Sequence, residues 1–139
     1  MNRVGHLLLI IAVAIVALSC KSEGHDNAAS ELSSASVDSV AVYCYNLQVK
    51  GQFDEYVKMM LSCDSMTADY KHRQILMLRQ HQVQIQKDKQ GVSVVKALRT
   101  EMHDGDKFAN VFLSVNYKDG SQEEILFPMV YDGKQWRIQ

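Results

Sequence analysis

The feature that most constrains this fold is a series of four alternating apolar segments in the last third of the chain. The predicted strands run over Val92 to Met102, Phe108 to Lys118, Glu124 to Tyr131 and Lys134 to Gln139. Each connection is short and contains Asp-Gly. Asp-Gly between alternating runs favours tight hairpins, because Gly accepts the positive φ that such a turn needs. This segment therefore predicts a four-stranded antiparallel sheet in meander order.

The two faces of the predicted sheet differ in composition. The expected core face of the second strand carries Ala109, Val111, Leu113, Val115 and Tyr117, and that of the third carries Ile125, Phe127, Met129 and Tyr131. The opposite face also contains apolar residues, which indicates cover by a partner molecule or by the curl of the sheet. Pro128 lacks a ladder donor, so we expect an edge position or a bulge there.

Helical spacing precedes the sheet. The apolar stripe of the first predicted helix is Val37, Val40, Ala41, Cys44 and Leu47 or Gln48. Ser36 is placed as its N-cap, and Gly51 is placed to end it in the left-handed conformation.

Two further helices are predicted after Gly51. The first is short, with Phe53, Tyr56, Val57, Met60 and Leu61 on one face. The second extends from about Met66 to Lys89, with Asp64 or Ser65 available to cap it. It contains neither Gly nor Pro, and we expect it to cover the sheet along a broad face.

The start of the chain reads as an export signal. After Arg3, residues Leu7 to Leu18 are apolar and uncharged, a stretch that fits a signal peptide and is too short to span a bilayer comfortably. It ends in Ala17-Leu18-Ser19-Cys20, which resembles the bacterial lipobox. The resemblance implies that residues 1–19 are removed and that Cys20 is acylated. The alternative is an uncleaved anchor with a chance cysteine.

Cleavage would leave a short tether and one domain. Residues 20–36 are rich in Ser and poor in large apolar side chains, which predicts a flexible tether, and residues 37–139 form the folded domain. Losing Arg3 leaves 14 of the 15 Lys and Arg side chains against 16 Asp and Glu, a net charge of −2. So mild a balance argues against nucleic acid as a partner. Acyl chains would hold the protein to a membrane.

Several segments resemble the nuclear transport factor two-like superfamily, in particular its small lipoproteins of unknown function from gut Bacteroidetes. The residues concerned are Lys50-Gly51-Gln52-Phe53-Asp54, Tyr117-Lys118-Asp119-Gly120-Ser121 and Asp132-Gly133-Lys134-Gln135-Trp136-Arg137-Ile138. The similarity covers roughly residues 37–139. It implies an α+β fold in which N-terminal helices pack on a curved four-stranded antiparallel meander sheet, cone-like, often with a pocket and often dimeric. It does not imply an activity.

Enzymes of that superfamily place an Asp or His base and a Tyr acid inside the cone. The residues that we expect near such a pocket are Tyr43, Tyr70, His81 and Tyr117. No carboxylate falls on the predicted apolar positions, so the base that enolisation or dehydration needs is missing from them. We therefore assign no catalytic residue, and we expect His81 to be a helix-flank residue among Met77, Leu78 and Ile85.

The cysteines and histidines predict no metal site or cofactor, because they lack the spacing of metal ligands. With Cys20 acylated, Cys44 and Cys63 remain as an even pair in an oxidising compartment. A disulfide between them would contribute about 3 kcal/mol. Two buried free thiols are favoured instead, because on a hairpin turning at Gly51 the position level with Cys44 lies nearer Val57 or Lys58 than Cys63.

The sequence thus predicts an envelope lipoprotein, anchored in the outer membrane of a Gram-negative bacterium. It does not decide between the periplasmic and the cell-surface side of that membrane. The leading expectation is a non-enzymatic module that binds a small apolar ligand or serves as an accessory protein. One alternative is a small enzyme, an isomerase or hydrolase of a hydrophobic compound that uses His81 with a tyrosine. Another is a structural homodimer through the mixed face of the sheet.

Overall fold

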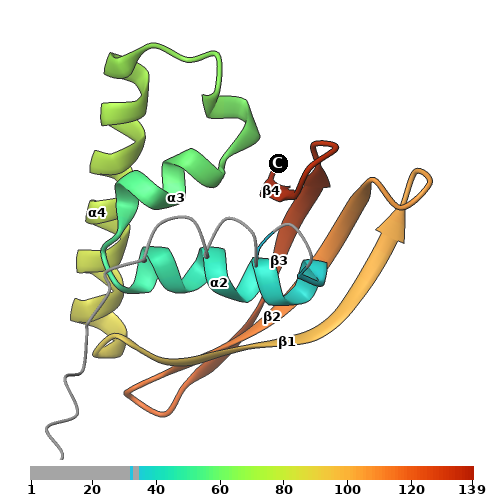
Figure 1. Ribbon diagram of the computed structural model, residues 1–139. Helices are drawn as coiled ribbons and strands as arrows, with labels where there is room; N and C mark the ends of the chain where they lie inside the picture. The colour runs from blue at the N-terminus through green and yellow to red at the C-terminus, as the bar shows by residue number, and fades with distance from the viewer. Residues whose placement is uncertain (1–31, 33–34) are drawn as a thin grey trace, which may run out of the picture.

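The computed structural model describes Leu32 and residues 35–139. The predicted signal peptide, Cys20 and most of the tether lie outside these residues. The elements in chain order are α2 (Val37–Val49), α3 (Phe53–Met59), the short 3-10 helix η1 (Leu61–Cys63), α4 (Ala68–Lys89), β1 (Val92–His103), β2 (Phe108–Tyr117), β3 (Gln122–Tyr131) and β4 (Trp136–Ile138) (Figure 1). The predicted α+β class is confirmed.

The sheet is an antiparallel meander in the order β1-β2-β3-β4, as predicted. Its central register pairs Ala97 with Leu113 and Leu113 with Ile125. Two register shifts interrupt the pairing of β1 with β2, one around Ser93 and one around Leu98. Extra residues of this kind bend the strand that carries them, and the sheet is visibly curved in Figure 1.

The helix held by the curved sheet is α2, which contacts all four strands. Its buried residues are Val37, Val40, Ala41, Cys44, Tyr45, Leu47 and Gln48, and they face the five core residues that were predicted for β2, all of which are buried. Leu32 and Ala35 pack against the same core. This arrangement confirms the predicted stripe of the first helix.

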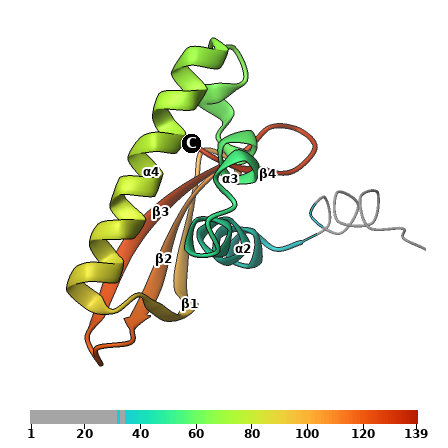
Figure 2. The same ribbon diagram turned by 90° about the vertical axis from the view of Figure 1, so that its left-hand side faces the viewer.

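The expectation that the long helix covers the sheet along a broad face is wrong. No residue of α4 is buried, although Leu78 and Ile85 pack partly against the core. The reason lies in its inward stripe, where Gln74, Gln82 and Lys89 interrupt the apolar residues and resist full burial. In Figure 2, α4 runs along one side of the sheet while α2 is seen nearly end-on.

The helix ends follow the sequence in part. Gly51 has φ of +72°, and α2 ends at Val49, directly before Lys50 and Gly51, as predicted. Ser36 occupies the N-cap position of α2, but its hydroxyl bonds that of Ser39 and not a backbone amide. Asp64 and Ser65 do not cap α4. Thr67 does, because its Oγ1 accepts from the Tyr70 amide at 3.3 Å.

The segment after α3 continues differently from the prediction. Met60 and Leu61 were expected on the helix face, but α3 ends at Met59. Met60 instead forms an isolated parallel bridge with Ile138 of β4. The chain therefore passes from a helix to the edge of the sheet within one residue.

Two predictions for β3, at Pro128 and at Tyr131, are wrong. The strand has neighbours on both sides and pairs Pro128 with Asn110 in unbroken register, so Pro128 lies neither in an edge strand nor at a bulge. The regular pairing with β4 begins only at Met129, and the Pro128 carbonyl accepts from the Gln139 amide at 3.2 Å, so the missing N–H falls where the ladder ends. Tyr131 was expected in the core but is exposed, with its ring 5.5 Å from that of Trp136.

Within residues 35–139, none of the helices combines the length and the apolar character that crossing a bilayer requires.

Candidate functional site

Two neighbouring hollows lie where α4 faces α2 and one end of the sheet. The larger has a volume of about 340 Å³ and the smaller about 140 Å³. Tyr45, Gln48 and Ile85 line both, so the two spaces adjoin at these side chains. The hollows exist because α4 does not bury its inward stripe, and its polar residues keep it away from the core.

Each wall of the larger hollow comes from a different element. Its main lining residues are Tyr45 and Gln48 from α2, His81, Ile85 and Lys89 from α4, and Tyr117, Glu123 and Ile125 from the sheet. Apolar surface and hydrogen-bonding groups are therefore mixed, which is typical of sites for small organic molecules.

A tyrosine and a carboxylate are joined in this wall. The Tyr117 hydroxyl donates to Glu123 Oε2 at 2.8 Å. Burial and then this hydrogen bond to Glu123 raise the pKa of Tyr117 above its ordinary value, and burial also raises the pKa of Tyr45. Both phenols are therefore protonated at neutral pH and present hydroxyl groups.

The mouth of the larger hollow carries charge of both signs. Lys89 Nζ donates to Ser121 Oγ at 3.2 Å and lies 5.6 Å from the centroid of the Tyr117 ring. Asp88, on the same helix, accepts a hydrogen bond from Gln84. With Glu123 included, the site offers one ammonium and two carboxylates.

The structure brings together two of the four residues that were expected near a pocket. His81 and Tyr117 line the larger hollow, while Tyr43 and Tyr70 line neither. Tyr43 is 39% exposed, because it lies one position before Cys44 and so turns off the inward stripe of α2. His81 also has an exposed side chain and belongs to the rim.

Sequence reasoning missed Glu123 and the role of Gln48. The third strand was expected to begin at Glu124, which left Glu123 in the turn. β3 begins at Gln122, and Glu123 pairs with Val115 on the core face. Extending the alternation of Ile125 and Phe127 back by one step would have found it. Gln48 was placed on the apolar stripe, but its polarity was not used.

Cys44 and Cys63 are separate, buried thiols. Burial raises the pKa of Cys44 to about 12, so its thiol is protonated at neutral pH. Cys63 lies 3.9 Å from the sulfur of Met60. Both behave as small apolar residues of the core.

Among the residues that the structure describes, no group of three or more His, Cys, Asp or Glu side chains is placed to hold a metal ion.

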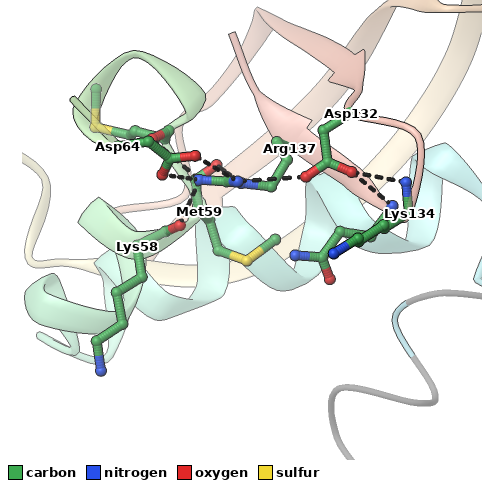
Figure 3. A network of polar contacts seen from close by, with 8 residues as sticks. Lys58, Met59, Asp64, Asp132, Lys134 and Arg137 are labelled. Atoms are coloured by element: carbon green, nitrogen blue, oxygen red, sulfur yellow. Dashed lines mark hydrogen bonds and ion pairs between the residues drawn. The ribbon is translucent and has the colours of Figure 1, made fainter.

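A second polar cluster surrounds Arg137 of β4, whose side chain is 9% exposed (Figure 3). It donates twice to Asp64, at 2.6 and 3.0 Å, and once to Asp132, at 3.3 Å. It also donates to the carbonyls of residues 58–60, at 2.9 to 3.3 Å. A cation at the C-terminal end of α3 is favourable. Because these acceptors satisfy its donors, we regard Arg137 as a structural tie.

Comparison with known proteins supports the fold. No family model and no curated protein matches the chain. A solved structure of a protein from Campylobacter jejuni, described as a candidate NTF2-like transpeptidase, superposes with a TM-score of 0.62. The match covers 75% of this chain and 97% of that one, at 6% sequence identity. The likeness therefore concerns the fold alone, and the chain has the NTF2-like cone fold.

Proposed function

We propose that this protein is a lipid-anchored protein of the bacterial envelope that binds a small organic molecule in the larger hollow. The observation that carries the binding role is the hollow itself, about 340 Å³, left open between α2, α4 and the sheet. Its volume lies within the range of roughly 300–1,000 Å³ that is typical of small-molecule sites. Its lining combines aromatic, aliphatic and hydrogen-bonding groups.

The exposure of the titratable groups in the hollow favours binding over catalysis. An enzyme of the expected class needs a buried carboxylate or imidazole close to a donor. Glu123 and His81 both have exposed side chains, and Glu123 already accepts from Tyr117. These groups are suited to recognising a ligand and not to taking a proton from carbon.

The ligand test is native mass spectrometry of the full-length protein purified from its own membrane. We expect a bound small molecule that is released when the protein unfolds. Ile125→Trp fills the hollow and should abolish the bound mass. Leu126→Trp is the matched control, because Leu126 is the next residue along β3 and is 53% exposed. Loss of the ligand in both variants, or in neither, contradicts the assignment to this hollow.

The anchor is supported by Arg3, the short apolar run and the Ala17-Leu18-Ser19-Cys20 sequence. Labelling of growing cells with palmitate tests it. The wild-type protein should carry label, and Cys20→Ala should carry none while Cys63→Ala keeps it. Label that survives Cys20→Ala would refute the lipid anchor.

The outer face of the sheet supports a second candidate function, a homodimer. Leu126 and Phe112 are directly paired on this face, and Leu126 is largely exposed. Arg99 lies over the Phe112 ring, 3.6 Å from its centroid, and pairs with Glu124 at 2.6 Å. A self-complementary surface with an apolar centre and both signs of charge at its rim suits two-fold association.

A further inference from the structure

The side chain of Gln48 brings an amide to the wall of the larger hollow. Gln48 is only 9% exposed and lines both hollows. Nearby side chains bond elsewhere, since Gln82 donates to the Val49 carbonyl and Lys89 to Ser121. None of the side-chain hydrogen bonds within the described residues includes the Gln48 amide.

The amide is accessible from the hollow, because none of the fully buried side-chain nitrogen or oxygen atoms of the described residues lacks a hydrogen-bond partner. A ligand that filled the hollow without bonding the amide would leave its donor and acceptor unsatisfied, which weakens binding. The Gln48 amide, which both donates and accepts, therefore indicates a ligand that does the same.

Two opposite charges of the same hollow meet at one tyrosine. Glu123 contacts the Tyr117 hydroxyl, and Lys89 lies over the Tyr117 ring. Within the described part of the chain, neither has an ion-pair partner. A carboxylate accepts through two oxygens and an ammonium donates three times, so both retain capacity for a ligand.

We propose that the larger hollow binds a small zwitterion that contains an amide, such as a dipeptide. Its amide would face Gln48, its ammonium would face Glu123, and its carboxylate would face Lys89. This inference rests on the proposed function and names its ligand class. The opposite charges of a dipeptide are about two residues apart, or roughly 7 Å, which suits two protein charges that contact the same side chain.

Other ligand classes fit the lining less well. A purely apolar molecule would leave Gln48 unpaired and would desolvate Glu123 and Lys89. A phosphate-bearing molecule would meet a single ammonium with the carboxylates of Glu123 and Asp88 close by, and this balance repels an anion. A zwitterion uses both signs.

The test is NMR of the full-length chain in detergent, with the Ile85 and Ile125 methyl groups as reporters from the hollow. We expect alanyl-alanine to shift both signals saturably. N-acetylation removes its ammonium and C-amidation removes its carboxylate, and each should raise the dissociation constant at least tenfold. Equal affinity for the free and the blocked forms would overturn the proposal.

Variants assign each end of the ligand. Glu123→Gln should weaken alanyl-alanine at least tenfold, and N-acetylation should cost nothing further in that variant. Gln48→Leu should also weaken binding at least tenfold without lowering the thermal midpoint, because none of the side-chain hydrogen bonds among the described residues includes the amide. Gln80→Leu, on the exposed side of α4, is the control and should bind as the wild type does. Undiminished binding by Gln48→Leu would refute the role of the amide.

Indole, an uncharged aromatic probe, distinguishes ligand binding in general from binding of a zwitterion. If indole shifts both methyl signals and alanyl-alanine does not, ligand binding stands and the zwitterion assignment is overturned. If neither probe shifts them, the zwitterion assignment also falls, and the retained mass in native mass spectrometry decides whether the hollow binds a ligand.

Discussion

Arg137 is the side chain on which the junction of α3 with β4 depends. Replacing it with Met leaves Asp64, Asp132 and the carbonyls of residues 58–60 without their cation. We expect Arg137→Met to lower the free energy of unfolding by about 2 kcal/mol, because buried acceptors such as the Met59 carbonyl lose their donor. Urea denaturation at pH 7 measures it.

The control for this variant is Arg99→Met on the exposed sheet face. Arg99 also pairs with a carboxylate, but both side chains are about half exposed. Such pairs contribute about 0–1 kcal/mol. An equal loss of unfolding free energy in Arg137→Met and Arg99→Met would contradict the prediction that burial makes the contacts of Arg137 more stabilising.

The same cluster predicts sensitivity to acid. The hydrogen bond from Arg137 holds the pKa of Asp64 below its ordinary value of 3.8. Its contribution to stability is therefore complete above that value and is lost as pH falls through the lowered folded pKa. The difference in urea midpoint between wild type and Arg137→Met should be constant from pH 7 to 5 and should narrow below about pH 4. A difference that does not narrow would contradict the role of the carboxylates.

Individual residues show what a sequence pattern can and cannot reveal. The carboxyl group of Asp64 and the hydroxyl groups before α4 are all able to cap a helix. Thr67 is the cap, because the Asp64 carboxylate accepts instead from Arg137, 73 residues away. No local pattern contains that contact. Glu123, in contrast, lay within reach of the alternation rule and was missed through a strand boundary two residues too late.

Among the elements, α4 is the wall that is least firmly held. Its clearest polar tie to α2 is the hydrogen bond from Gln82 to the Val49 carbonyl, at 2.9 Å. Gln82→Ala should lower the free energy of unfolding by about 1 kcal/mol. It should also speed hydrogen exchange of the amides in the second half of α4. The amides of β2 should exchange as in the wild type.

Gln80→Ala is the matched control for that prediction, since Gln80 lies on the exposed side of the same helix. Faster exchange in β2, or equal effects of the two variants, would show that α4 does not open separately from the core.

The pattern predicted the α-helices α2, α3 and α4 and the four strands, but not the 3-10 helix η1 and not which helix the sheet holds. α2 and α4 were both assigned an apolar stripe. The deciding difference is that the α2 stripe is apolar almost throughout, whereas Gln82 and Lys89 stand in the α4 stripe. Length suggested α4, and burial of polar groups decided for α2.

The outer face of the sheet is the surface through which the homodimer would form. If the homodimer forms there, sedimentation of the full-length protein in detergent should show a mass of two chains that falls to one on dilution. Leu126→Lys should give one chain at every concentration, because it places a charge at the apolar centre. Val83→Lys is the control, since Val83 is 63% exposed on α4. A single chain for the wild type at high concentration would exclude this dimer.

The separation of a packed half from an open half has one more consequence. The packing of α2 against β2 secures folding, while none of the α4 residues around the larger hollow is buried and, among them, Ile85 packs partly against the core. Substitutions in that wall can therefore accumulate with little penalty to survival of the native state. If the larger hollow binds a ligand, related proteins could therefore change that ligand while they keep the same fold.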